Sequence, residues 1–358
     1  MVPYWIATGA KENRFSSDLL DNADVIHSQV SGKRVLLVGG AGSIGSATLR
    51  ALLGWQPREI VVADVDENGL AELGHELRFT TPEGTALRLV AVDYGSQAMR
   101  RLLDGGVDLA LNFAALKHVH SERDLVSLLQ MVDTNVLKQA RFIGWLSECG
   151  CARYFNVSTD KAADPRCFMG ATKRAQESLL WGLDAGCPTS SSRFANVAFS
   201  RGSVLDIWSR RLARHQDLVV TTGVRRHFMS TAEAGTLCML AAACTPPRTL
   251  LVPDLCASDE VVLTDLADAL IEATGALATV HEQAAEAYEK ASESFVGAGE
   301  ALVPFGKRTR TIRANPVSVD LLSWLGDLET LCACRRVDKP ALARALAPVA
   351  PGFCWEAA

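Results

Sequence analysis

A glycine-rich turn between a short apolar strand and a helix constrains this chain more than any other feature of its sequence. Residues 33–38 predict a buried strand, and Gly-Gly-Ala-Gly-Ser-Ile-Gly at 39–45 leads into a helix expected to run to about Leu53. Glycines at such a turn let the backbone approach a pyrophosphate, toward which the first helical amides point. A plain tight turn needs the same glycines, so the pattern by itself is weak evidence. The residues proposed for the cradle are Gly39, Gly42, Ser43, Ile44 and Gly45.

The end of the next predicted strand supports the same interpretation. Residues 59–63 form this strand, and Asp64 follows it about 20 residues after the glycines. An acidic residue in this position typically accepts hydrogen bonds from the adenosine ribose and repels a 2′-phosphate, so NAD is favoured over NADP. Asp66 lies close enough to compete with Asp64, and the one that is not used is expected to be a solvated surface carboxylate.

Two further strands are predicted after a helix at about 67–79. Residues 87–92 end at an Asp-Tyr pair whose carboxylate can hold the adenine amino group, and 107–115 end in small residues that let a cofactor approach. Strands that alternate with helices at this spacing predict an α/β fold with a doubly wound parallel sheet of the Rossmann type. The proposed cofactor contacts at these strand ends are Asp93, Tyr94, Ala114 and Ala115.

The rest of the chain predicts a smaller C-terminal substrate-binding region. We expect an N-terminal arm at 1–31, an NAD-binding Rossmann domain at 32–200 and a mainly substrate-binding region at 201–358. Within the last of these, about 230–275 is expected to return to the Rossmann core. The other elements predicted are helices at about 125–149, 263–274 and 282–292, strands at 191–197 and 249–252, a solvated basic run at 307–310 and a C-terminal helical region.

Composition restricts the partners and the compartment. The 358 residues are 48% hydrophobic and carry a net charge of −5, which argues against nucleic acid or an anionic membrane as a main partner. The chain has no uncharged apolar stretch of about 18 residues and no recognisable leader, so a cytoplasmic protein is expected. Its ten cysteines are expected to be mostly reduced core thiols. Neither Cys332 with Cys334 nor His118 with His120 has further ligands nearby, so no metal site is expected.

A second stretch concentrates chemically active side chains. An apolar run from 153 ends in Ser-Thr-Asp-Lys at 158–161, and the following helix carries Met169 and Lys173 on one face because they are four residues apart. If the run is a parallel strand, its carboxyl end is where ligands bind in open α/β sheets. A hydroxyl, a carboxylate and two ammonium groups then share one small volume. Taken singly, the Thr-Asp pair also suits a helix cap, and Met169 also suits core packing.

Several motifs follow one another in a fixed order: the glycine turn at 39–45, Ala-Ala-Leu-Lys-His-Val at 114–119, Thr-Asn-Val at 134–136, Ser-Thr-Asp-Lys-Ala at 158–162, Met-Gly-Ala-Thr-Lys-Arg at 169–174, Arg-Phe-x-Asn-Val at 193–197, Ser-Arg-Gly-Ser-Val at 200–204 and Arg-His-Phe-Met at 226–229. In this order they resemble the extended short-chain dehydrogenases/reductases, specifically the nucleotide-sugar 4,6-dehydratases typified by UDP-N-acetylglucosamine 4,6-dehydratases of polysaccharide biosynthesis. The resemblance covers about 32–254. Met169 marks one branch of these dehydratases, because most of the superfamily has tyrosine there.

The chain departs from the pattern of that family in several places. The C-terminal quarter lacks the usual segment that contains Gly-Glu-Lys, which affects the expected substrate more than the expected reaction. The single-residue departures are Val38 for Thr, His120 and Asp206 for Pro, and His227 for Tyr.

The resemblance implies a 4,6-dehydration of a UDP-sugar such as UDP-N-acetylglucosamine, in which NAD oxidises C4, water is eliminated across C5 and C6, and the hydride returns to C6. It further implies Lys161 as the base at C5, Asp160 as the acid at C6 and Thr159 as a hydrogen-bond donor to the 4-oxygen. A thioether cannot act as a base, so the group that deprotonates the 4-hydroxyl is left open between Asp160, Lys173 and a water molecule.

The resemblance also implies substrate contacts and an assembly. Asn196, Ser203 and Arg226 are expected to hold the nucleotide diphosphate, and a homo-oligomer is expected. Two other functions remain open: a nucleotide-sugar 4-epimerase or 4-oxidase, against which the Asp-Lys pair argues, and a non-catalytic dinucleotide-binding protein. The proposed substrate-binding residues are Lys117, His118, Asn196, Ser203, Val204 and Arg226.

Overall fold

The computed structural model describes residues 3–286, 289–313, 318–353 and 355. Within these residues, a nine-stranded sheet has the order β13-β14-β10-β6-β5-β4-β1-β2-β3. The strands from β10 to β3 are parallel, and β14 and β13 add an antiparallel edge. The bounds are β1 Arg34–Val38, β2 Glu59–Asp64, β3 Ala86–Ala91, β4 Leu109–Asn112, β5 Arg153–Val157, β6 Thr189–Ser192, β10 Thr249–Pro253, β13 Leu302–Pro304 and β14 Thr309–Arg313. This order confirms the predicted Rossmann-type sheet, with its switch point between β1 and β4.

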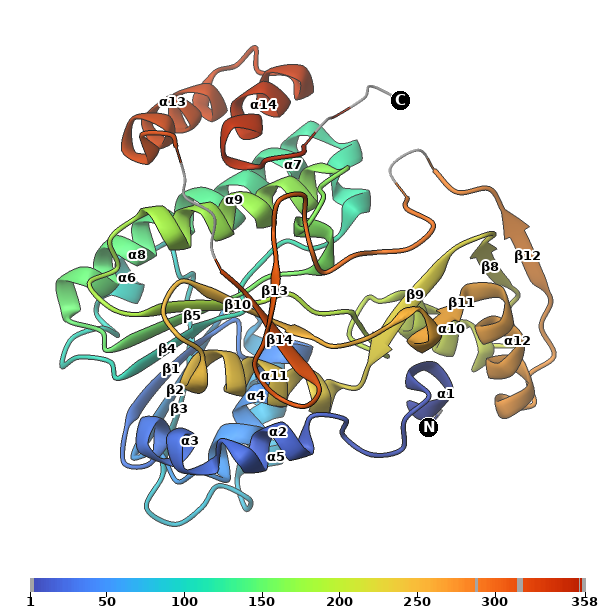
Figure 1. Ribbon diagram of the computed structural model, residues 1–358, viewed down its shortest axis with the longest axis horizontal. Coiled ribbons are helices and arrows are strands. Elements are labelled where there is room, and N and C mark those ends of the chain that lie inside the picture. The colour runs from blue at the N-terminus through green and yellow to red at the C-terminus, as the bar shows by residue number, and fades with distance from the viewer. Residues whose placement is uncertain (1–2, 287–288, 314–317, 354, 356–358) are drawn as a thin grey trace.

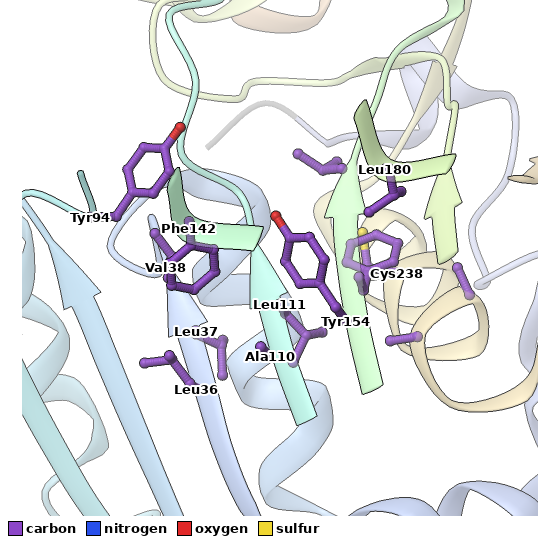
Figure 2. Close-up of a cluster of buried hydrophobic side chains, with 14 of the residues drawn as sticks. Leu36, Leu37, Val38, Tyr94, Ala110, Leu111, Phe142, Tyr154, Leu180 and Cys238 are labelled. Carbon is purple, nitrogen blue, oxygen red and sulfur yellow. The ribbon is translucent and has the colours of Figure 1, made fainter. Parts of the chain in front are cut away.

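Helices cover both faces of this sheet (Figure 1), which explains why strands such as β1 are apolar on both sides. One face carries α2 Ser16–Asp21, α3 Ala23–Val30, α4 Ser43–Leu53, α5 Glu67–Leu77 and α11 Thr231–Cys244. The other carries α6 Gln97–Arg100, α7 Leu125–Val132, α8 Lys138–Cys149 and α9 Phe168–Gly182, with α13 Leu321–Ala333 and α14 Lys339–Leu346 outside them. Figure 2 shows part of the core, where the Phe142 ring meets Tyr94 and Tyr154 edge-on at centroid distances of 5.9 and 5.8 Å.

A smaller lobe lies beside the carboxyl ends of the parallel strands (Figure 1). It contains a three-stranded sheet of order β11-β9-β7 and a parallel pair of β12 and β8. Trp208, Phe228 and Leu266 belong to a separate apolar cluster that holds it together. The elements are α1 Trp5–Thr8, β7 Asn196–Val197, α10 Val204–Leu212, β8 Leu218–Thr221, β9 Arg225–Met229, β11 Glu260–Val262, α12 Leu263–Thr274 and β12 Val280–Gln283.

Three predicted elements differ from the structure. The helix expected at 282–292 is wrong, because Val280–Gln283 pairs with β8 as a strand and the described residues beyond it are irregular. Residues 287–288 of that prediction lie outside the described chain. The helix expected at 125–149 contains a π-helical turn at Asp133–Leu137. The strand expected at 191–197 is divided between β6 and β7.

The basic run is only partly a solvated face. The Lys307 side chain is exposed and lies 2.9 Å from Asp21, whereas the Thr309 hydroxyl is buried and donates to Asp18 at 2.7 Å. Among the described residues, no helix combines the length and the hydropathy needed to cross a membrane.

Candidate active site

The glycine turn brings the backbone after β1 against the end of β4. Gly39 has φ +73°, and a Cβ atom there would lie 2.6 Å from the Ala114 nitrogen. A Cβ atom on Gly45 would lie 2.4 Å from the Gly39 oxygen. Gly42 occupies the N-cap of α4, so the free amides of that helix open onto the turn. A cradle that only glycine can form, at a helix N-terminus and at the switch point of the sheet, fits the pyrophosphate of a dinucleotide.

The two acidic residues at the end of β2 and just beyond it have different surroundings. The Asp64 carboxylate accepts hydrogen bonds from the backbone amides of Ala41 at 2.9 Å and Asp66 at 3.0 Å, so it lies against the glycine turn. Asp66 instead caps α5 by accepting from Gly69 at 2.9 Å, and it pairs with Arg201. Asp66 therefore has a structural role, and Asp64 is the carboxylate beside the cradle.

Asp93 and Tyr94, which the sequence proposed at the adenine end of the cofactor, both have partners within the protein. Asp93 accepts from Lys138 at 2.5 Å and from the Gly95 amide at 2.8 Å. The Tyr94 side chain lies in the core and donates to the Thr134 carbonyl, which leaves only its backbone to face a cofactor (Figure 2).

A π-helical turn positions a polar side chain that the sequence showed only as part of a motif. Asn135 accepts from the Leu116 amide and donates to the Leu116 carbonyl, both at 2.9 Å. It also donates to the Thr172 hydroxyl at 3.0 Å. Asn135 therefore joins the loop after β4 to α9, and π-helical turns often occur at functional sites for such reasons.

The residues after β5 form a compact hydrogen-bonded cluster. The Thr159 hydroxyl donates to Asp160 Oδ1 at 2.7 Å, and Lys161 reaches the same oxygen with its amide at 2.8 Å and its Nζ at 3.2 Å. Asp160 is buried, and the Lys161 side chain is a quarter exposed. Burial alone lowers the pKa of Lys161, but the Asp160 and Glu293 carboxylates more than offset it, so the pKa lies above its usual value. This direction is opposite to the one a lysine base requires.

Helix α9 presents Met169 and Lys173 to the same cavity. Lys173 is buried and donates from Nζ to the Val157 carbonyl at 2.7 Å. Burial lowers the pKa of Lys173 to about 7, the value at which an amine exchanges protons near neutrality. The first amides of α9 donate hydrogen bonds to a carboxylate that the sequence did not indicate. Glu122 accepts from the Phe168 amide at 3.0 Å and from the Met169 amide at 2.6 Å.

A buried ionic network holds the residue that follows β5 in place. Ser158 donates to Glu177 at 2.5 Å, and the fully buried Arg193 pairs with Glu177 at 2.6 Å and Glu300 at 2.5 Å. Although burial opposes ionisation, Arg193 and Arg174 lower the pKa of Glu300 to about 2. The network fixes Ser158, which precedes the Thr159-Asp160-Lys161 cluster, and ties it to the chain near residue 300.

A cavity of about 590 Å³ lies at the carboxyl end of β5 and reaches Ile44 at the start of α4, and its volume is typical of small-molecule sites. The Thr159-Asp160-Lys161 cluster and α9 line this cavity together with residues of the smaller lobe. Three residues that the sequence did not indicate, Glu289, Lys290 and Glu293, also line it. The proposed residues that line it are Ile44, Ala115, Lys117, His118, Thr159, Asp160, Lys161, Met169, Lys173, Asn196, Ser203, Val204 and Arg226.

All three of the proposed phosphate contacts already have partners. Asn196 donates from its side-chain amide to the His227 carbonyl at 3.3 Å. Ser203 caps α10 by accepting from the Asp206 amide at 3.3 Å. Arg226 donates to the Lys290 carbonyl at 2.8 Å and lies 3.7 Å from Glu289. Within the part of the chain that the structure describes, no group of three or more His, Cys, Asp or Glu side chains could hold a metal ion.

The strand order, the glycine turn and the Thr-Asp-Lys cluster beside a buried helical lysine define an extended short-chain dehydrogenase/reductase. The chain belongs to the family described as "Polysaccharide biosynthesis protein", whose model matches residues 35–301. Among solved structures, Pen from Bacillus thuringiensis shares the fold, with a TM-score of 0.71 and 22% identity over 79% of this chain and 88% of that one.

The relatives of this chain are named for different activities. "Probable polysaccharide biosynthesis protein EpsC" of Bacillus subtilis is 29% identical over 259 residues, or 72% of this chain and 43% of that protein. "UDP-N-acetylglucosamine 4,6-dehydratase (inverting)" of Campylobacter jejuni is 26% identical over 212 residues, or 57% of this chain and 61% of that protein. "UDP-glucose 4-epimerase" of Rickettsia akari is 26% identical over 224 residues, or 58% of this chain and 62% of that protein. The chain thus spans less than two thirds of the length of each of these relatives.

Proposed function

We propose that this chain is an NAD-dependent nucleotide-sugar 4,6-dehydratase that acts on a UDP-sugar such as UDP-N-acetylglucosamine. The observation that carries the proposal is the Thr159-Asp160-Lys161 cluster facing the same cavity as Lys173. A 4-epimerase moves a hydride at C4 and needs no acid and base for C5 and C6, whereas this cavity holds groups for both. The similarity to a 4,6-dehydratase supports the proposal, and the similarity to an epimerase makes 4-epimerisation the second candidate.

When bound, NAD supplies the redox chemistry by accepting hydride from C4 and returning it to C6. The glycine turn holds the pyrophosphate, and Asp64 accepts from the adenosine ribose, which favours NAD over NADP. Arg226, with its charged guanidinium in the cavity, holds the diphosphate of the sugar nucleotide. Asn196 and the helix N-terminus at Ser203 assist it.

The lowered pKa of Lys173 supports this lysine as the group that receives the 4-hydroxyl proton. A partly neutral amine accepts a proton near pH 7. The thioether of Met169 cannot act as a base, so Lys173 is the group on α9 that can take this proton. The Thr159 hydroxyl, which donates to Asp160 in the structure, donates instead to the developing 4-ketone when substrate is bound. Asp160 protonates the departing C6 oxygen, and Lys161 handles the C5 proton.

Incubation of the purified chain with UDP-N-acetylglucosamine and NAD, followed by mass spectrometry and sugar analysis, tests the proposal. A dehydratase yields a product that has lost one water. An epimerase yields an isomer of unchanged mass, and absence of turnover on every nucleotide sugar tried favours a non-catalytic dinucleotide-binding protein.

A further inference from the structure

A buried carboxylate beside Lys161 has no part in the reaction as proposed above. The Glu293 side chain is 7% exposed, and its Oε1 lies 3.6 Å from Lys161 Nζ. Its Oε2 has no hydrogen-bond partner among the residues that the structure describes, and it lies 3.8 Å from Lys290 Nζ. Buried polar atoms are nearly always hydrogen-bonded, so an exception that lines a ligand cavity requires an explanation.

The chain around Glu293 is held in place on both sides. Before it, Lys290 Nζ donates to the Asp164 carbonyl at 2.5 Å. After it, the Phe295 carbonyl accepts from the buried Arg193 at 2.9 Å, and Glu300 accepts from the Gly297 amide at 2.7 Å. The position of Glu293 is therefore built by the same ionic network that supports Ser158, and functional groups need such support to hold their geometry.

Because Asp160 is the acid at C6 in the proposed function, Glu293 is the second carboxylate beside Lys161 that can accept its proton. Asp160 Oδ1 already accepts from the Thr159 hydroxyl and from the amide and Nζ of Lys161. The other cations facing Glu293 are Lys290 and Arg226. Burial raises the pKa of Glu293 although Lys161 opposes this. A shift of less than about 1 Å would bring Lys161 to charge-assisted hydrogen-bond distance from it.

We propose that Glu293 and Lys161 act together as the base at C5, with Glu293 accepting the ammonium proton of Lys161 when substrate fills the cavity. This inference rests on the proposed function. The N–H bond of Lys161 breaks and an O–H bond forms on Glu293, which leaves a neutral amine and a neutral acid. The amine then takes the C5 proton, and the C5–H electron pair forms the C5–C6 double bond as the C6–O bond breaks. The proton stored on Glu293 returns through Lys161 and Asp160 to the departing oxygen, which leaves as water.

The test compares two steps of one reaction in the Glu293→Gln variant. The wild type and the variant are mixed with NAD and UDP-N-acetylglucosamine in deuterated solvent. Absorbance of reduced nicotinamide reports C4 oxidation, and mass spectrometry reports deuterium at C5. We expect C4 oxidation at the wild-type rate and C5 exchange slowed by about 100-fold or more, the size of a general acid–base contribution. Residual exchange should rise with pH, because Lys161 must then lose its proton to solvent.

Two variants serve as controls. Glu286→Gln lies on the same segment but is exposed and pairs with Arg123 at the surface, so both steps should match the wild type. Glu293→Asp keeps a carboxylate and should recover part of the C5 exchange.

The outcomes separate the two proposals. Wild-type exchange in Glu293→Gln, in an enzyme that dehydrates its substrate, would overturn the role of Glu293 and leave the proposed function intact. Equal loss of both steps in Glu293→Gln and Glu293→Asp would also overturn it, since the residue would then serve folding or C4 oxidation. A wild type that neither oxidises nor dehydrates any nucleotide sugar would instead overturn the proposed function.

Discussion

Replacement of the buried Lys173 by methionine should remove a specific pH dependence from the stability of the protein. Lys173 has its pKa lowered from 10.5 to about 7 in the folded chain, whereas an unfolded lysine keeps its usual value. Between these values the unfolded state binds more protons than the folded state, so stability rises with pH. Below about pH 7 both states are protonated, and the cost of the buried charge is present in full.

The size of the effect follows from the two pKa values. Integration of the proton linkage between about pH 6 and about pH 9 yields a gain of about 2.5 kcal/mol in the free energy of unfolding of the wild type. Lys173→Met should lack this gain. The variant also loses the hydrogen bond from Nζ to the Val157 carbonyl at both pH values.

Urea unfolding of both proteins at the two pH values, without NAD, measures the difference directly. Other groups titrate in the same range, so the informative quantity is the wild-type change minus the change in Lys173→Met. A difference near zero would refute the assignment of a lowered pKa to Lys173, and with it the support for this residue as the acceptor of the 4-hydroxyl proton.

Further predictions concern the cofactor cradle and the buried network. Gly39→Ala should weaken NAD binding at least about tenfold, measured by calorimetry, because its Cβ would meet the end of β4; Gly144→Ala, which meets no atom within 4 Å, should not. Asp64→Ala should lose about 10- to 100-fold in NAD affinity and narrow the preference over NADP, as expected for hydrogen bonds to a charged group. Arg193→Ala should destabilise the fold by about 3–5 kcal/mol in urea unfolding, because it removes one of the two cations that pair with the buried Glu177 and Glu300 and leaves Arg174 as the other. The exposed Arg100→Ala should cost less than about 1 kcal/mol.

The parallel sheet was predictable because its information is local. Each of its first strands is a short apolar run that ends at a characteristic residue, such as Asp64 at the end of β2, and glycines mark the first turn. The predicted helix at 282–292 failed for the opposite reason. Its Ala and Glu content favours a helix, but pairing of Val280–Gln283 with β8 depends on a strand about 60 residues earlier in the chain.

The candidate site likewise contains residues that local sequence could predict and one that it could not. Thr159, Asp160 and Lys161 are adjacent in sequence, so their proximity needed only the strand end. Glu293 reaches Lys161 from 132 positions further along the chain, and only the tertiary structure reveals that contact. The pKa of Lys161, which burial lowers and the Asp160 and Glu293 carboxylates together raise above its usual value, depends partly on that contact. The sequence could therefore name the lysine but not the direction of its pKa shift.

Sequence spacing also could not predict the direction in which side chains at strand ends point. The motif after β3 placed Asp93 and Tyr94 together at the adenine end. In the structure the Tyr94 ring turns into the core against Phe142, and Asp93 pairs with Lys138. Spacing predicts which strand end a residue occupies, but packing decides where its side chain points.

The product formed from UDP-N-acetylglucosamine in deuterated water tests the central claim most directly. If Asp160 and Lys161 eliminate water across C5 and C6, the product lacks one water and carries solvent deuterium at C5, and Lys161→Ala abolishes both changes. A product of unchanged mass, or C5 exchange that persists in Lys161→Ala, would contradict this account.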